Sequence, residues 1–76
     1  MTQQGNATVF ERLYDSEINF SVEAFYDAGY LVQLGDSFNG FVDSATCKTM
    51  AEVEAWLTEA ACRHYPDSEF ARAVMA

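Results

Sequence analysis

Hydrophobic and polar side chains alternate along the first half of the chain, from position 18 to position 34. Up to the first predicted turn, the apolar members of this pattern occupy every second position: Ile18, Phe20, Val22, Ala24 and Tyr26. The positions between them are polar except for Phe25. A period of two is typical of a strand with one buried face and one face in solvent. After Gly29, the residues Tyr30, Val32 and Leu34 continue the pattern, which predicts a returning antiparallel strand.

Further strands are predicted on both sides of this hairpin. Residues 8–14 (TVFERLY) alternate aromatic and branched residues with charged ones, which predicts a first strand. Residues 35–40 (GDSFNG) are rich in turn-forming residues, with Asn39-Gly40 as the expected pivot. Residues 41–47 are expected to form a less regular last strand.

A change to helical periodicity begins at Thr49. Thr49 and Glu52 match the capping box, in which a hydroxyl and a carboxylate satisfy free backbone N–H groups at a helix start. Apolar and aromatic residues then recur every three or four positions on one face: Val53, Trp56, Leu57, Ala60 and His64. Pro66 cannot continue this helix, and Pro66, Asp67 and Glu69 suit the first turn of a second, short helix.

These elements predict an α+β fold: a three- to four-stranded antiparallel sheet, a meander, followed by one main amphipathic helix and a short C-terminal helix. The 76 residues leave room for a single domain over 1–76, in which residues 1–7 are expected to be a frayed or disordered terminus. A chain this short buries only about 60% of its unfolded surface, so we expect marginal stability. Half of the residues are hydrophobic, which favours a folded protein over an acidic disordered tail.

The charge balance narrows the choice of partner. Twelve acidic residues outnumber four basic ones, and the net charge is −8. Such a charge repels nucleic acid and anionic lipid, and it attracts basic protein surfaces. We therefore expect no direct binding to nucleic acid or membrane and favour a basic protein partner. The alternative explanation is that the acidity only keeps a small cytosolic protein soluble.

Motifs of enzyme chemistry are absent from the sequence. There is no glycine-rich phosphate loop, nucleophile elbow or zinc-binding His pair. His64 is interpreted as a packed or edge histidine. Cys47 and Cys62 fit no disulfide framework, redox motif or zinc pattern. Cys47 is expected to be a buried small hydrophobe, and the alternative is a pKa lowered by the nearby helix start. Residues 36–40 are explained better by turn chemistry than by a metal loop, because the acids of an EF-hand are missing. We therefore expect a protein that is not an enzyme and has no catalytic residue, metal or cofactor.

Candidate functional residues lie on the predicted surface. The candidate acidic contacts are on strand faces, turns and the main helix: Glu23, Asp27, Asp36, Asp43, Glu52, Glu54 and Glu59. The candidate apolar anchors stand among polar neighbours: Phe25, Leu31 and Phe38. Exposed apolar groups among acids are typical of a protein-binding surface. The alternative is that the second helix, or another copy of the chain, covers them. Imitation of DNA would require the acids to gather on one side of the protein.

Two segments carry a resemblance to a known group of proteins. Residues 16–44 (SEINFSVEAFYDAGYLVQLGDSFNGFVDS) and 49–72 (TMAEVEAWLTEAACRHYPDSEFAR) resemble very small acidic proteins from phage-like elements. The size, the acidity, the order of sheet and helix, and the EAWL and HYPDSEFAR segments are most similar to anti-CRISPR inhibitors of type I systems, with subtype C as the nearest. The resemblance implies binding to subunits of the type I surveillance complex (Cascade) and blockade of target DNA binding, by DNA mimicry or steric occlusion.

The roles of individual residues follow from the surface pattern and not from a family motif. In this interpretation Glu23, Asp27, Asp36 and Asp43 stand in for phosphates. Phe25 and Phe38 are the apolar anchors. Two other functions stay open: a non-catalytic homodimeric adaptor, and an acidic partner of another basic nucleic-acid-binding protein. A homodimer is also compatible with inhibition. With no apolar run near the roughly 18 residues that span a membrane, and no signal peptide, the expected location is the cytoplasm of an infected or lysogenic bacterial host.

Overall fold

The structure, a computed structural model, describes residues 8–75. The elements follow one another as α1 (Val9–Asp15), β1 (Phe20–Phe25), β2 (Gly29–Asp36), β3 (Gly40–Cys47), α2 (Met50–His64) and α3 (Glu69–Met75). The strands form one antiparallel sheet in the order β1-β2-β3. This confirms the predicted α+β fold, a meander followed by a main helix and a short C-terminal helix. The prediction for residues 1–7 lies outside the described residues.

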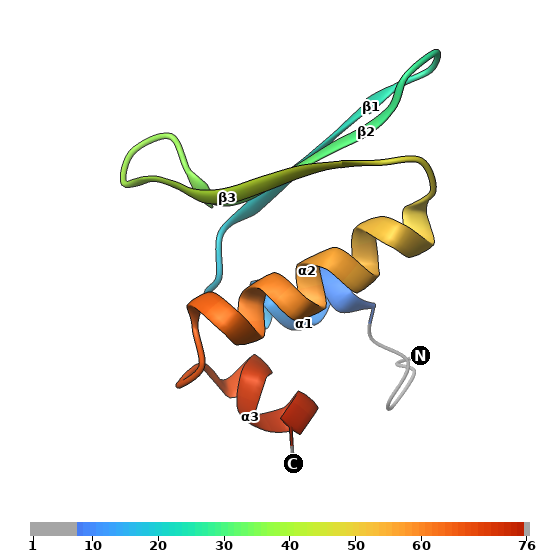
Figure 1. Cartoon of the computed structure of the whole chain (residues 1–76). Helices are drawn as coiled ribbons and strands as arrows, with labels where there is room; N and C mark the ends of the chain where they lie inside the picture. The colour runs from blue at the N-terminus through green and yellow to red at the C-terminus, as the bar shows by residue number, and fades with distance from the viewer. Residues whose placement is uncertain (1–7, 76) are drawn as a thin grey trace, which may run out of the picture.

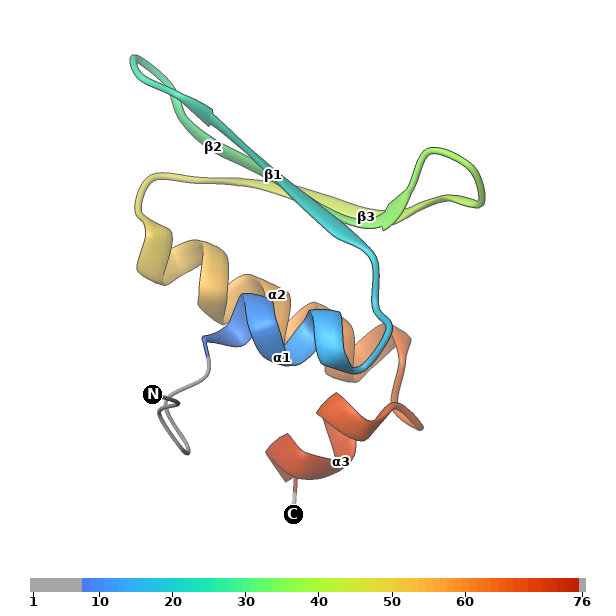
Figure 2. The same cartoon turned by 180° about the vertical axis from the view of Figure 1, so that it is seen from behind.

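All three helices lie on the same side of the sheet (Figures 1 and 2). α2 packs against β2 and β3, α1 lies beside α2, and α3 contacts α2 farther from the sheet. We call the side of the sheet that contacts the helices the inner face and the opposite side the outer face. Within the described part of the chain, no helix covers the outer face. The β1–β2 and β2–β3 turns project beyond the helices at opposite ends of the sheet (Figure 1).

The core lies between the inner face and the helices. Val32 and Leu34 of β2 are fully buried, as are Val53 and Leu57 of α2. Burying an apolar side chain of this size stabilises a fold by about 1.5–3 kcal/mol. The predicted buried faces of the returning strand and of the main helix are therefore confirmed at these four positions.

The predicted buried face of β1 extends too far toward the first turn. Phe20 and Val22 pack against the core, but Ala24 is exposed and Tyr26 is fully exposed. β1 ends at Phe25, so Tyr26 belongs to the turn. This end of the hairpin projects past the helices (Figure 1). The alternating pattern therefore continues to Ala24 and Tyr26, although no helix is there to cover these side chains.

The predicted first strand over residues 8–14 is wrong, because this segment is the helix α1. Thr8 and Glu11 form a complete capping box: Thr8 Oγ1 accepts from the Glu11 N–H at 3.1 Å, and Glu11 Oε1 accepts from the Thr8 N–H at 3.0 Å. Val9, Phe10 and Leu13 then share one helical face that packs into the core. The same motif at Thr49 is incomplete, since the Glu52 carboxylate accepts from the Lys48 N–H instead of that of Thr49.

α1 ends in a tight turn that redirects the chain into β1. The Ile18 N–H donates to the Leu13 carbonyl and the Glu17 N–H to the Tyr14 carbonyl, both at 3.0 Å. This pair of bonds is the Schellman motif, and its left-handed position usually holds glycine. Here Glu17 occupies it with φ 62°. The buried pair of Leu13 and Ile18 stabilises the turn despite this strained residue.

Glycines allow the two hairpins to close. Gly29, in the predicted first turn, has φ 95°, and a Cβ there would lie 2.5 Å from the Cys47 carbonyl oxygen. Gly35 has φ 110°, and a Cβ there would lie 2.6 Å from the Gly40 carbonyl oxygen. Gly35 stands at an irregularity in the pairing of β2 with β3. Only glycine combines this conformation with such close backbone contact.

The second short helix begins later than predicted. α3 starts at Glu69, and Ser68 caps it: its Oγ accepts from the Ala71 N–H at 3.1 Å. Pro66 and Asp67 instead belong to the turn between α2 and α3. Among the described residues, no helix combines the length and the apolar character that crossing a membrane requires.

Candidate binding surface

The charges are distributed unequally between the sheet and the helices. Residues 16–47, which contain all three strands and both hairpin turns, hold five acids and no Lys or Arg. The remainder of the chain holds the other seven acids and all four basic residues. The bases of that part are Arg12, Lys48, Arg63 and Arg72. The composition left open whether the charges are distributed asymmetrically. They are, because the strands and hairpin turns carry acids and no base, whereas the rest of the chain carries both.

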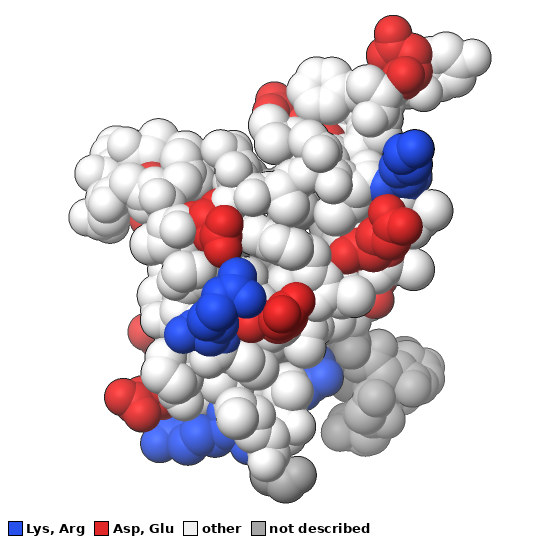
Figure 3. All heavy atoms as spheres, in the orientation of Figure 1, with Lys and Arg blue, Asp and Glu red and all other residues white. Residues whose placement is uncertain are grey.

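The helical side of the protein shows mixed charge. Figure 3, in which the helices lie below the sheet, shows separate acidic groups with basic side chains next to several of them. Glu59 of α2 pairs with Arg63 at 3.5 Å, as its four-residue spacing suggests. Glu52 is engaged with the backbone N–H of Lys48 at the start of α2. Of the three predicted contacts on this helix, Glu54 makes no ion pair with a described residue.

The outer face of the sheet brings together three of the predicted contacts. Glu23 and Leu31 are directly opposite each other on β1 and β2, and Phe25 is opposite Gly29 at the end of the same face. Their strand neighbours Val22 and Val32 belong to the inner face, which packs on the core. The side chain of Phe25 is 46% exposed. An acid and two apolar groups therefore lie on one surface, as the alternating pattern predicted.

Aromatic side chains are also exposed at both hairpin turns. Phe38, a predicted anchor in the β2–β3 turn, is 93% exposed. Tyr26 and Asp27 lie in the β1–β2 turn, and both are exposed. Sequence reasoning assigned Tyr26 to the core, so its exposure adds a candidate contact. The only available signal was its position next to the turn residues at 27–29, where a strand face ends.

Asp36, a predicted contact, has a structural role in the β2–β3 turn. Its carboxylate accepts from the backbone N–H groups of Asn39 (2.7 Å) and Phe38 (2.8 Å), and from Nδ2 of Asn19 (2.7 Å). The Asn39 N–H, followed by the Asn19 amide and the Phe38 N–H, lowers the pKa of Asp36 below its usual value. This turn chemistry was the preferred explanation of residues 36–40, and it ties the turn to the chain entering β1.

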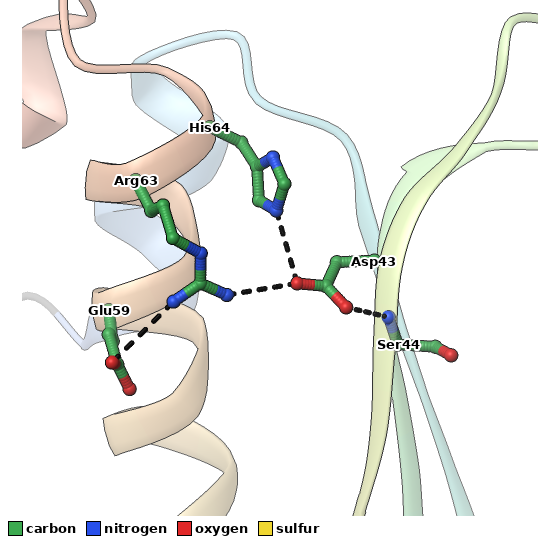
Figure 4. A network of polar contacts seen from close by, with 5 residues as sticks. All are labelled: Asp43, Ser44, Glu59, Arg63 and His64. Carbon is green, nitrogen blue, oxygen red and sulfur yellow. Dashed lines mark hydrogen bonds and ion pairs between the residues drawn. The ribbon is translucent and has the colours of Figure 1, made fainter.

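Asp43, another predicted contact, points toward the helices (Figure 4). Its Oδ2 lies 2.9 Å from Nη2 of Arg63 and 3.1 Å from Nε2 of His64, and its Oδ1 accepts from the Ser44 N–H at 2.8 Å. The hydrogen bonds from His64 and Arg63 lower the pKa of Asp43. His64 is thus an edge histidine that links α2 to the sheet, in agreement with the interpretation of the sequence.

The remaining candidate chemistry concerns the two cysteines and a metal site. Cys47 is buried, and burial together with the negative charge of Glu52 raises the pKa of its thiol. The alternative of a thiol activated by the helix start is therefore wrong. Cys47 and Cys62 are both free thiols. Between residues 8 and 75, no three His, Cys, Asp or Glu side chains gather as a metal site would require.

An open groove of 560 Å³ lies where three connections meet. Its walls come from the α1–β1 connection, the β2–β3 turn and the α2–α3 turn, and they include Ile18, His64 and Tyr65. His64, which lines this groove, contacts the Asp43 carboxylate through its Nε2 atom at 3.1 Å. No family model, curated protein sequence or solved structure matches the chain. The similarity to anti-CRISPR inhibitors therefore stays a prediction.

Proposed function

We propose that the protein is a non-catalytic inhibitor that binds a type I CRISPR surveillance complex and prevents it from binding target DNA. The target class comes from the sequence resemblance. The single observation that supports it is the sheet, whose strands and hairpin turns carry four acids and no Lys or Arg. Such a layer is attracted to the basic path that a nucleic-acid-binding complex offers to DNA, and electrostatic attraction also speeds association.

The magnitude of the charge favours occlusion over close imitation of DNA. The protein is 35 Å across in its longest direction. Duplex DNA of that length carries about 20 phosphate charges, at one per about 1.7 Å. The strands and hairpin turns hold four acids, two of which, Asp36 and Asp43, are bonded within the chain. The inhibitor therefore occupies the path as a folded obstacle that charge draws into place.

The other carboxylates and the exposed apolar groups have different roles in the proposed complex. Glu23 and Asp27 make no hydrogen bond or ion pair with another described residue, so they are available to Lys and Arg of the complex. Phe25 and Phe38 are exposed and supply apolar contact. Asp36 and Asp43 support the surface by holding the β2–β3 turn and the edge strand in place.

A second candidate function is supported by the same distribution of charge but has a different target. An acidic partner of another basic nucleic-acid-binding protein would use the same layer of strands. A homodimeric adaptor is favoured by the exposed Phe25 and opposed by charge, since each copy carries −8. The sequence resemblance is the reason for which we propose the surveillance complex as the target.

The test is a gel shift of target duplex DNA by a purified type I surveillance complex, preincubated with increasing amounts of this protein. We expect the shifted band to disappear once the protein reaches at least one molecule per complex, and added salt to weaken the effect. Addition after the DNA has bound should inhibit much less, because the path is already filled. An undisturbed band across several subtypes would contradict the proposal, and inhibition at far fewer molecules than complexes would indicate a catalytic inhibitor instead.

A further inference from the structure

We propose that the outer face of the sheet, with the adjoining β1–β2 turn, is the surface that contacts the partner, and that it takes a basic protein surface with an apolar recess. The inference rests on the proposed function for the identity of the partner, but its location and chemistry come from the fold. In this inference Glu23 and Asp27 contact the partner, and the acids of α2 do not. The sequence pattern had grouped them together.

The geometry of the outer face shows what a partner would meet. Glu23, Leu31 and Thr46 are paired side by side across β1, β2 and β3. The neighbouring row is polar, and its Ser21 Oγ donates to Gln33 Oε1 at 3.4 Å. The outer face therefore has an apolar centre, one carboxylate, and hydroxyl and amide groups that can exchange hydrogen bonds. This is the mixture that protein–protein contacts use.

The aromatic side chains extend this surface at the β1–β2 turn. Phe25 is 46% exposed at the end of the outer face, and Tyr26 is fully exposed in the turn that follows. Aromatic residues of this kind carry much of the binding energy in protein interfaces, because they bury a large area at small entropic cost. Asp27, next to them, adds a second carboxylate at the tip.

The charge of the outer face distinguishes between three possible partners: a second copy of the chain, nucleic acid and a basic protein surface. The outer face presents Glu23 and no base, and the turn presents Asp27 and no base. A second copy would bring another base-free face against this one, so its carboxylates would meet carboxylates. Nucleic acid would meet the same repulsion. A basic protein surface is the occupant whose charge complements the face, and Lys or Arg side chains can reach both carboxylates while an apolar group covers Leu31.

Three of the four basic residues lie on the helices, and Lys48 is the exception. Arg63 is engaged by Asp43 and Glu59, and Arg12 stacks on the ring of Phe70 at 5.3 Å. Lys48 follows β3 directly and lies in a shallow hollow beside the β1–β2 turn. Arg72 belongs to α3, which lies farther from the sheet than α2. Lys48 is therefore the base nearest to the proposed contact, and its removal should not weaken binding.

The first test compares charge reversals of equal size on the two sides of the protein. Glu23→Lys changes the outer face, whereas Asp15→Lys makes the same change at the exposed last residue of α1, where a base suits the helix dipole. Leu31→Gln and Phe25→Thr remove the apolar contacts but keep residues that suit a strand. Binding to the surveillance complex is measured for each variant that retains the wild-type urea midpoint.

The expected result is a loss of affinity of at least tenfold for Glu23→Lys, Leu31→Gln and Phe25→Thr, and less than threefold for Asp15→Lys. Equal losses for Glu23→Lys and Asp15→Lys would overturn the inference, because net charge would then act without a defined surface. Such a result would leave the proposed function standing, since wild-type binding is the separate measurement that decides it.

The second test does not depend on the surveillance complex. A deca-arginine peptide is titrated into the isotope-labelled protein, and backbone amide shifts are followed by NMR. We expect the largest shifts at β1, at the β1–β2 turn and at Leu31, even if the complex itself is not bound. Largest shifts on α2 or α3 would overturn the inference. Sedimentation of the free protein completes the test: a dimer abolished by Leu31→Gln would show that a second copy covers this face, which contradicts a basic partner.

Discussion

The carboxylate of Asp43 lies 2.9 Å from the guanidinium of Arg63, and this contact joins the edge strand β3 to the last turn of α2. The same carboxylate oxygen contacts His64 at 3.1 Å (Figure 4). A residue that the sequence suggested as a contact for a partner is therefore part of the link between sheet and helix. The distinction matters for mutagenesis, because its loss would weaken binding through the fold.

We expect Asp43→Asn to lower the stability of the protein at neutral pH. The pKa of Asp43 is lowered from its usual value of 3.8 by His64 and Arg63, so the charged carboxylate favours the folded state. This contribution is fully present above pH 3.8 and is lost as the pH falls through the lower folded value. Urea midpoints of the wild type and the variant, measured from pH 7 downward, should therefore converge in acid. A difference that stays constant down to pH 2.5 would contradict this role.

We expect Glu17→Gly to stabilise the protein by about 0.5–1 kcal/mol. Glu17 holds the left-handed position of the Schellman motif with φ 62°, a conformation that glycine adopts without steric cost. Urea denaturation gives the change in unfolding free energy. Glu17→Ala is the matched control, because it removes the same charge but keeps the strained Cβ. An equal gain in both variants would mean that relief of charge repulsion, not backbone strain, is responsible.

We expect Gly35→Ala to destabilise strongly, by more than about 2 kcal/mol, since it combines left-handed strain with steric overlap. A Cβ there would lie 2.6 Å from the Gly40 carbonyl oxygen. Gly40→Ala is the comparison, because Gly40 has φ 96° but nothing within 4 Å of a new Cβ. It should cost only the conformational strain, about 1–2 kcal/mol. Thermal melting of both variants separates the two terms, and equal losses would show that overlap at Gly35 is relieved by a shift of the turn.

We expect Asp27→Lys and Asp36→Lys to weaken binding for different reasons. The side chain of Asp27 makes no hydrogen bond or ion pair with another described residue. Its replacement should therefore reduce inhibition and leave the melting temperature unchanged. Asp36 accepts from Asn39, Phe38 and Asn19, so its replacement should lower the melting temperature and loosen the β2–β3 turn. Melting curves recorded beside the inhibition assay distinguish the two. A stable Asp36→Lys variant would show that the turn holds without its carboxylate.

Much of the sheet could be predicted because a strand repeats its pattern over short distances. Val32 and Leu34 were assigned to the buried face from alternation, and both are fully buried. Alternation also led to the wrong assignment of residues 8–14. Seven residues are too few to distinguish the two-residue repeat of a strand from the repeat of a helix. The Thr8 and Glu11 capping box was the stronger local signal, since it satisfies specific backbone N–H groups at a helix start.

The candidate surface was predicted less completely. The grouping of Glu23, Phe25 and Leu31 follows from a period of two and from antiparallel pairing, so the sequence contained it. The role of Asp43 was not contained in it, because its partners Arg63 and His64 are distant along the chain. For Asp36, the local bonds from Phe38 and Asn39 agree with the predicted turn chemistry, and only the bond from Asn19 depends on the fold. A carboxylate in a turn looks the same in a sequence whether it faces solvent or holds the turn.

The elements of the C-terminal half, the meander and the base-free segment over residues 16–47 could be predicted from the sequence alone, since these depend on composition and on neighbours a few positions apart. Which acids remain available to a partner depends on contacts between segments that are distant along the chain. The tertiary structure placed all three helices on one face of the sheet, so Arg63 could neutralise Asp43 on the inner side while Glu23 stayed without a base on the outer side. The physical reason is that ion pairs and burial act over a few ångströms in space, and chain folding alone sets those distances.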